Sequence, residues 1–285
     1  MKITGIDITP IAVKDPPLLN SVGVHQPYAL RSIVEVHTDA GITGIAEAYG
    51  DDPTLANLRA AAASLGGLDV FDLNGLDRRV AVALGRVAAS SPTELVGTPS
   101  VAKTIASTVS AFEVALFDAQ GKAVGRPVCD LLGGAVRAAV PFSGYLFYKW
   151  AGHPGEEPDG FGEALDPDGI VAQAKWLVDR YGFGSLKLKG GVFPPDEEIA
   201  AIRALRAAFP GYPLRLDPNA NWTVRTSHRV AAELADALEY LEDPTPGIDG
   251  MAEVAAGTDL PLATNMCVTS FEAVPEGIAR KAVRT

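Results

Sequence analysis

The sequence predicts two parts, an α+β domain at the amino end and then an incomplete (β/α) barrel with about five of the eight strands that such a barrel contains. Three observations support this prediction. Residues 1–50 have the pattern of β-strands and residues 54–126 that of helices, short apolar segments alternate with helical ones from residue 139 onward, and each short segment ends in charged or amide residues. Strands followed by helices are typical of an α+β domain, whereas alternation is typical of a parallel sheet.

The first part, residues 1–126, begins with a predicted three-stranded antiparallel sheet. Its segments are ITGIDITPIAV, LRSIVEVHTD and ITGIAEAYG, and the last two are joined by a tight turn at Asp39-Ala40-Gly41. Helical patterns follow in TLANLRAAAASL, near LDRRVAVAL, and in SVAKTIASTVSAFEVALFDAQGKAVG. Gly121 and Gly125 predict the end of the last helix.

The second part, residues 139–285, reads as short strands separated by helices. The predicted strands are AVPFSGYLF, FGSLKLKGG, PLRLDPNAN, EYLEDP and LPLATNM. Pro195-Asp196 opens one helix, and Thr226-Ser227 opens another that extends to Leu238. Since strands separated by helices pair in parallel, this part predicts a parallel sheet.

Polar side chains end these predicted strands at intervals of about one strand-plus-helix unit. They are Lys187 and Lys189 in LKLKGG, Asp217 and Asn219 in LRLDPN, Glu242 in YLEDP and Asn265 in LATNM. Alternate residues of a strand share a face, so both lysines point to the same side. Functional groups of a (β/α) barrel converge at the carboxyl ends of its strands, where we expect these residues to meet.

The residue types indicate a divalent cation beside a base. Two carboxylates and an amide oxygen on neighbouring strands suit Mg²⁺, which prefers oxygen ligands. Lys187 and Lys189 would lie about 6.6 Å apart along the strand. Like charges at that distance repel by roughly 2.5 kcal/mol at an effective dielectric of 20, which lowers a lysine pKa by about one to two units. One of the two lysines is then expected to act as a general base near neutral pH.

Each of these features also has a structural interpretation. A lysine pair in a strand often marks an exposed face or edge, and the "DPN" and "EDP" segments are common where a strand turns into a loop. The combination of these features favours a functional site, because the residue preferences of turns alone do not place lysines and metal-type oxygens at four successive strand ends.

The sequence resembles the enolase superfamily, on its mandelate racemase and muconate lactonizing enzyme side, and most closely the glucarate dehydratase family. The resemblance rests on KDPPLLNSVGVHQPYALRSIVEV, AFEVALFDAQGKAVGRPVCDLLGG, KLKGGV, LRLDPNANW, LEDP and ATNM. The asparagine of ATNM is the narrowest of these signals, because many relatives place a carboxylate there. The resemblance implies a capping domain over residues 1–126 and a partial TIM-type barrel over residues 139–285.

The resemblance also implies a role for each candidate residue. Asp217, Glu242 and Asn265 would hold Mg²⁺, with Asp249 as a competitor of Glu242. Lys189 would abstract the proton α to the substrate carboxylate, while Lys187 would stabilise the enediolate; enolase-superfamily sites combine such a base with Mg²⁺. Substrate contacts are implied for His25, Thr104, Tyr145, Lys187 and Asn219.

The implied reaction is that of a carbon–oxygen lyase, specifically a hydro-lyase of carbohydrate acid catabolism. An aldarate, D-glucarate, would lose its α-proton and β-hydroxyl to give a keto-deoxy-glucarate. Two alternatives remain open: another acid-sugar dehydratase or an epimerase of the same superfamily, and a non-catalytic remnant that needs a complementing chain.

Compared with the family pattern, the sequence is expected to be truncated at its carboxyl end. Three strand-plus-helix units would be absent, together with the Asp-His pair that serves as acid and base on the opposite face of the substrate. None of the four histidines stands at a predicted strand end. We therefore expect impaired dehydration, and two sheet edges that lack partners.

Composition restricts the partners. The chain of 285 residues has a formal charge of −11 and contains no block of basic residues. We therefore expect a small-molecule substrate as its partner, and neither nucleic acid nor an anionic membrane surface. No apolar run is long enough to span a membrane, and MKITGIDITP does not resemble a signal peptide. Cys129 and Cys267 lack metal or disulfide spacing, which is typical of a cytoplasmic protein. The family resemblance implies a homo-oligomer as a further expected partner state.

Overall fold

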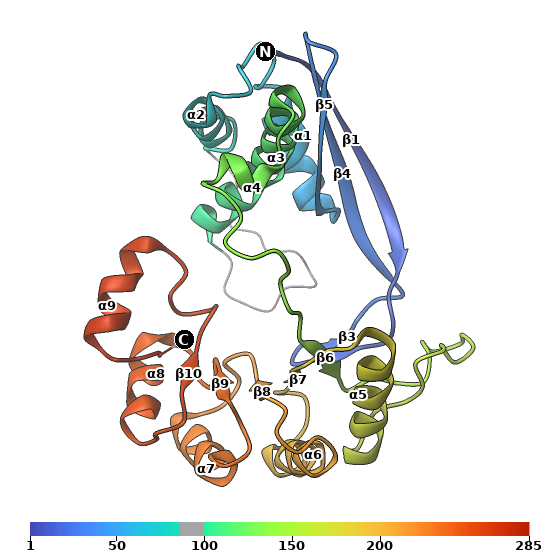
Figure 1. The fold of residues 1–285 in the computed structure, drawn as a ribbon, viewed down its shortest axis with the longest axis vertical. Helices are drawn as coiled ribbons and strands as arrows, with labels where there is room; N and C mark the ends of the chain where they lie inside the picture. Colours follow the sequence, from blue (N-terminus) through green and yellow to red (C-terminus); the bar gives the residue numbers. More distant parts are fainter. Residues whose placement is uncertain (86–99, 285) are drawn as a thin grey trace. The chain divides into compact units, whose positions relative to one another are not determined.

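The computed structural model describes residues 1–85 and 100–284 (Figure 1). The chain divides into two compact units, one made of Met1–Lys14 with Tyr28–Ala139, and the other of Asp15–Pro27 with Val140–Thr285. In the described residues, none of the helices is long and apolar enough to cross a membrane.

The first unit contains the predicted antiparallel sheet. Its strands are β1 (Ile3–Lys14), β4 (Tyr28–Thr38) and β5 (Thr43–Tyr49), in the order β1-β4-β5. The turn between β4 and β5 closes where the sequence predicts it, with the Thr38 amide donating to the Ile42 carbonyl at 3.1 Å. Gly41 in this turn has φ +71°, a backbone angle that glycine adopts without strain.

The first unit also contains helices, the longest of which packs against this sheet. They are α1 (Asp52–Ala62), α2 (Leu73–Ala83), α3 (Val101–Val124) and the short α4 (Val128–Leu131), which the sequence did not predict. Phe112 and Leu116 of α3 are fully buried in one core with Val34 and Val36 of β4. As predicted, α3 ends at Gly125, which has φ +65°. Gly121 lies inside the helix, where a Cβ would come within 2.8 Å of the Arg126 carbonyl oxygen.

The second unit is built on the predicted parallel sheet. Five strands pair in the order β10-β9-β8-β7-β6, which is their order along the chain. They are β6 (Gly144–Phe147), β7 (Leu186–Lys189), β8 (Leu214–Asp217), β9 (Tyr240–Glu242) and β10 (Leu262–Ala263). The unit also contains a separate two-stranded antiparallel sheet, made of β2 (Leu19–Asn20) and β3 (Gly23–Val24). The first strand is shorter than predicted because pairing with β7 starts only at Gly144.

Helices separate the parallel strands. They are α5 (Pro167–Tyr181), α6 (Pro195–Ala208), α7 (Val224–Leu234) and α8 (Gly247–Ala256), followed by η1 (Phe271–Ala273) and α9 (Val274–Ala279). The prediction for α6 is confirmed. That for α7 was wrong at both ends: Thr223 caps the helix by accepting from the Thr226 amide, so it begins earlier, and Leu238 lies beyond its end.

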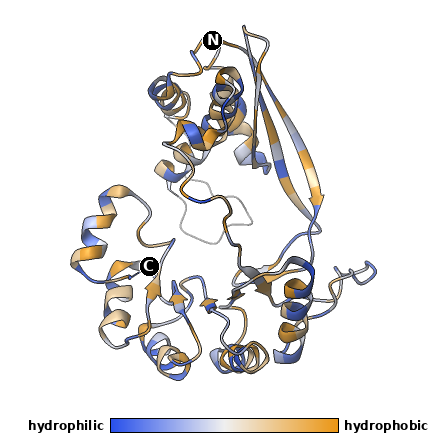
Figure 2. Ribbon diagram, in the orientation of Figure 1, coloured by the Kyte–Doolittle hydropathy of each residue, from blue (hydrophilic) through white to orange (hydrophobic). Residues whose placement is uncertain are grey.

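The two faces of the parallel sheet differ sharply. Leu186 and Leu188 of β7 are fully buried in the core formed with helices of this unit, and Figure 2 shows that these helices carry hydrophobic residues on only part of their surface. Lys187 and Lys189 point to the other face, because alternate residues of a strand do so. The leucines therefore anchor the strand that presents the lysines.

The segment Asp15–Pro27 belongs with the second unit although it is contiguous with the first in sequence. The Leu19 amide donates to the Tyr148 carbonyl at 2.7 Å, and the Trp150 amide donates to the Pro17 carbonyl at 3.2 Å. The domain ranges predicted from sequence, 1–126 and 139–285, remain a prediction; the units differ from them chiefly in this segment.

Replacing Leu188 with alanine is expected to lower the free energy of unfolding by about 2–5 kcal/mol, because the side chain is fully buried and its removal leaves a cavity. Urea unfolding followed by circular dichroism measures the change. As a control, Val82→Ala removes a side chain that is 83% exposed, and it should change stability by less than about 0.5 kcal/mol. Equal effects of the two substitutions would contradict the burial of Leu188.

Candidate active site

The polar residues predicted at the strand ends come together on one face of the parallel sheet. We call Lys187, Lys189, Asp217, Asn219, Glu242 and Asn265 the strand-end cluster. Lys189 on β7 is the register partner of Asp217 on β8, and its Nζ donates to Asp217 Oδ2 at 3.0 Å. Lys187 Nζ lies 3.0 Å from the same oxygen and donates to Glu242 Oε2 at 2.7 Å. The predicted convergence of amines and carboxylates is therefore present in the geometry.

Asn219 joins the cluster through an unusual backbone. Its φ of +54° lies in the left-handed region, which asparagine tolerates better than most residues. This conformation turns the chain directly after β8, so that the Asn219 amide donates to Asp217 Oδ1 at 3.1 Å. Its side-chain oxygen accepts from Lys189 Nζ at 2.6 Å. The ammonium group of Lys189 thus lies between a carboxylate and an amide oxygen.

Glu242 and Asn265 occupy the ends of the next two strands. Asn265 Nδ2 donates to Glu242 Oε1 at 3.3 Å. Asp249, the competing ligand, lies on α8, has a side chain that is 80% exposed, and forms an ion pair with Arg280 at 2.5 Å. The structure therefore groups Glu242, and not Asp249, with the rest of the cluster.

Asp243 is a residue of this region that sequence reasoning missed. It is buried, with φ +38°, and its carboxylate accepts from Thr264 Oγ1 at 2.5 Å and from the Asn265 amide at 2.9 Å. Burial raises the pKa of this carboxyl above its ordinary value. Asp243 therefore stabilises the turn that contains Asn265. In the sequence, the one indication of this role was the position of Asp243 directly after Glu242 in "EDP".

The electrostatics of the cluster are dominated by its close ion pairs. Burial alone would raise the pKa of Asp217, yet its pKa is lowered because the charges of Lys189 and Lys187 outweigh that effect. The sequence predicts a lowered pKa for one of the two lysines without deciding which, and Lys187 is not that lysine. Burial lowers it, but the nearby carboxylates of Asp217 and Glu242 prevail, and the pKa is raised. Carboxylates at hydrogen-bond distance act more strongly than the second lysine.

Tyr145 of β6 borders the cluster. Its hydroxyl donates to Asp217 Oδ2 at 3.2 Å, and Lys187 Nζ lies 4.9 Å from its ring centroid. Burial, reinforced by the charge of Asp217, raises the pKa of Tyr145 well above its usual range. The hydroxyl therefore remains a proton-bearing donor at neutral pH.

His25 and Thr104, the other two candidates for substrate contact, lie in different units. The His25 ring centroid is 6.1 Å from that of Phe147, the register partner of Lys189, and His25 Nδ1 lies 2.8 Å from Asp15 Oδ2. Thr104 belongs to the first unit, where it is buried and its hydroxyl donates to the Ser100 carbonyl at 3.0 Å. The geometry thus brings His25 beside the strands of the second unit.

The donor set of the cluster fits a hard cation. Asp217 and Glu242 are 2% and 7% exposed, and the Lys187 ammonium already lies between their oxygens, so the two carboxylates converge on one cationic position. Asn265 lies next to Glu242 and carries an amide oxygen, although it is the amide nitrogen that faces Glu242. Among the described residues, no three or more His, Cys, Asp or Glu side chains are placed to hold a metal, so a cation here would rest on two carboxylates, an amide and its own water or substrate ligands.

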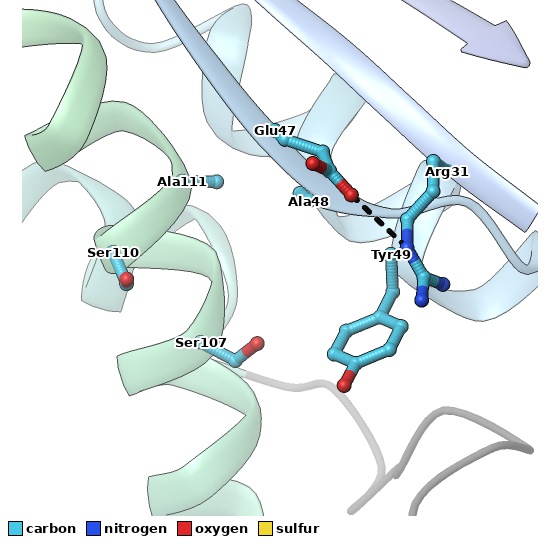
Figure 3. Close-up of a pocket in the computed structure, with 7 residues that line it drawn as sticks. All are labelled: Arg31, Glu47, Ala48, Tyr49, Ser107, Ser110 and Ala111. Atoms are coloured by element: carbon cyan, nitrogen blue, oxygen red, sulfur yellow. Dashed lines mark ion pairs between the residues drawn. The ribbon is translucent and has the colours of Figure 1, made fainter. Parts of the chain in front are cut away.

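Two pockets lie outside the cluster. One of about 180 Å³ adjoins β6 and includes Tyr145 and Phe147 in a mostly apolar lining, which does not match a polyhydroxy acid. Figure 3 shows the other, about 330 Å³ in the first unit, where Arg31 Nε lies 3.0 Å from Glu47 Oε1 and the Arg31 guanidinium lies 4.8 Å from the Tyr49 ring centroid. No residue predicted for the site lines this second pocket.

A parallel sheet with sequential strand order, whose strand ends gather lysines, carboxylates and amides, defines a domain of the (β/α)-barrel class with its site at the usual edge. The chain belongs to the enolase superfamily. Residues 5–133 match the mandelate racemase / muconate lactonizing enzyme N-terminal domain, and residues 169–285 match the enolase C-terminal domain-like family. The chain therefore combines the superfamily's capping domain with a barrel-like domain.

Individual relatives support this membership. A Streptomyces coelicolor protein named "Probable glucarate dehydratase" is 57% identical over 100% of this chain and 68% of its own length. An enolase structure from Thermobispora bispora, complexed with magnesium and formate, is 61% identical in sequence and has a TM-score of 0.95; the match covers 99% of this chain and 67% of that one.

An enolase structure from Mycobacterium smegmatis, complexed with tartrate, is 59% identical and has a TM-score of 0.91; the match covers 99% of this chain and 66% of that one. The chain spans about two thirds of the length of these relatives.

Proposed function

We propose that the strand-end cluster serves Mg²⁺-dependent dehydration of an acid sugar, with D-glucarate as the substrate. The observation that carries this proposal is the meeting of the Lys189 amine with the Asp217 carboxylate at 3.0 Å, next to Lys187 and Glu242. The 57% identity to a protein named as a glucarate dehydratase supports the choice of substrate class.

In this proposal Asp217, Glu242 and Asn265 hold the metal. Their oxygens come from three neighbouring strands, and magnesium is present in the related structure from Thermobispora bispora. Bound Mg²⁺ would neutralise negative charge developing on the substrate carboxylate. Glu242 is preferred over Asp249 because Asp249 is exposed and paired with Arg280.

The charge of the cluster favours an anionic substrate. With Lys189 as the neutral amine that a base requires, Lys187 carries one positive charge and Asp217 and Glu242 carry two negative charges. A divalent cation added to these groups leaves a charge of about +1, which a substrate carboxylate would balance.

The lysines then have distinct parts. Lys189 takes the proton from the carbon α to the substrate carboxylate, because its Nζ is held by only one carboxylate and the neutral amide of Asn219. Lys187, whose Nζ lies within hydrogen-bond distance of both Asp217 and Glu242, keeps its proton in this proposal and stabilises the enediolate. Asn219, Tyr145 and His25 are proposed as contacts to the rest of the substrate, and the contact of Thr104, which belongs to the first unit, stays a prediction.

The test separates proton abstraction from dehydration. The protein of residues 1–285 is incubated with D-glucarate and Mg²⁺ in D₂O, and proton NMR follows loss of the α-proton signal while a keto-acid assay follows the product. We expect exchange to be faster than dehydration, because none of the four histidines, all of which lie in the described residues, is at a strand end of the parallel sheet to protonate the leaving hydroxide.

The outcomes also decide between the alternatives. Inversion at the exchanging carbon without keto-acid formation would identify an epimerase. Exchange with galactarate or another diastereomer, but not with glucarate, would identify a different acid-sugar dehydratase. A folded protein that neither exchanges the α-proton nor binds Mg²⁺ in calorimetry would contradict the proposal and favour a non-catalytic role.

A further inference from the structure

A buried carboxylate lies directly behind the proposed base. Glu198, in the first turn of α6, has no exposed surface. Its Oε2 accepts from the Gly191 amide at 3.0 Å, and its Oε1 accepts from the Val192 and Phe193 amides at 2.8 and 3.1 Å. One side chain thus binds three successive backbone donors.

These three donors belong to the turn that follows Lys189, residues 190–193, which we call the Lys189 turn. The first residue of the turn, Gly190, donates its own amide to the Asp217 carbonyl at 2.8 Å. A Cβ on Gly190 would come within 2.7 Å of Glu198 Oε2, and one on Gly191 would overlap the Pro218 carbonyl. Only glycines allow the turn to lie this close to both Glu198 and the end of β8.

Burying this carboxylate opposes its ionisation. Burial raises the pKa of Glu198, and the backbone donors of the Lys189 turn are what favour its charged form. An acidic residue needed only to favour the start of a helix can remain in water, as the exposed Glu197 does in the same turn of α6. The position of Glu198 is therefore better explained by the turn that it binds.

We propose that Glu198 is a positioning residue for Lys189. By fastening the Lys189 turn, it holds the end of β7 so that Lys189 Nζ stays on Asp217 and Asn219. Its importance for turnover rests on the proposed function of Lys189, but its effect on the placement of the Lys189 amine does not.

The test measures the placement of Lys189 directly. Wild-type protein, Glu198→Gln and the matched control Glu197→Gln are treated briefly with acetic anhydride, and mass spectrometry gives the acetylation rate of each lysine. Lys189 is 12% exposed and paired in the native structure, so we expect its rate to rise at least about fivefold in Glu198→Gln and not in Glu197→Gln. Lys149, which is 1% exposed in the same unit, should keep its rate in both variants.

The comparison with Lys149 distinguishes positioning from general destabilisation. An unchanged Lys189 rate in Glu198→Gln, or equal rises at Lys189 and Lys149, would overturn the proposal. If Glu198→Gln does not fold, the same ratio is measured in Glu198→Asp, whose shorter side chain retains the charge but cannot reach all three donors, and the same expectation applies.

Enzyme kinetics provide the second readout. If wild-type protein exchanges the substrate α-proton, Glu198→Gln should lower kcat about 10- to 100-fold per folded molecule with little change in KM. An absence of exchange in the wild type would count against the proposed function alone, because the acetylation ratio still decides the role of Glu198.

Discussion

Replacing Lys189 with methionine is expected to lower the rate of α-proton exchange about 1,000-fold. Methionine keeps much of the apolar stem but has no amine to receive the proton, and a positioned general base contributes about 10²- to 10⁴-fold. Deuterium incorporation into D-glucarate, followed by proton NMR in the presence of Mg²⁺, measures the loss.

The substitution should leave the metal site and the fold in place. The three proposed ligands, Asp217, Glu242 and Asn265, are all retained, so Mg²⁺ affinity measured by calorimetry should change by less than about tenfold. Lys175→Met, which removes an exposed lysine of α5, serves as the control and should exchange at the wild-type rate. Exchange in Lys189→Met that equals the control would exclude Lys189 as the base.

Replacing Asp217 with asparagine is expected to lower the free energy of unfolding of metal-free protein by about 3–5 kcal/mol. Asp217 is 2% exposed and pairs with both Lys187 and Lys189. Its removal leaves two partly buried ammonium groups without their shared counter-charge, which costs far more than losing a surface pair. The same substitution should abolish measurable Mg²⁺ binding, because one of only two proposed carboxylate ligands is lost.

A matched control and the pH dependence sharpen this prediction. Asp196→Asn breaks the ion pair between Arg229 and Asp196, whose side chain is 77% exposed. This control should lower the free energy of unfolding by less than about 1 kcal/mol.

The stabilising effect of Asp217 is also expected to depend on pH. Because the pKa of Asp217 is lowered in the folded protein, the stabilisation is present above the ordinary aspartate pKa of about 3.9 and is lost as the pH falls below it. The difference between wild type and Asp217→Asn should therefore shrink in acid, and a constant difference from pH 7 to pH 3 would contradict the ion-pair assignment.

Local patterns were sufficient to predict the sheets and the meeting of the strand-end residues. The alternation of leucine and lysine in LKLK determines which side chains enter the core, because successive residues of a strand face opposite sides. The strand-helix repeat then places Asp217, Glu242 and Asn265 at one edge, since parallel strands share the direction of their carboxyl ends. These inferences needed only short stretches of sequence.

Other features depended on contacts between distant segments. The placement of residues 15–27 with the second unit follows from hydrogen bonds to Tyr148 and Trp150, which no local pattern contains. The raised pKa of Lys187 could not be predicted from sequence, because the sequence displays the neighbouring lysine but not the distances to Asp217 and Glu242.

The sequence by itself determined the two kinds of sheet, the face of β7 that carries the lysines and the order in which polar groups reach the strand ends. Only the tertiary structure decided which carboxylates are buried, which amine each one contacts, and that Glu198 and Asp243 hold the turns behind Lys189 and Asn265. The physical reason is that strand periodicity acts over a few residues, whereas burial and Coulomb interactions depend on distances in space between groups far apart in the chain.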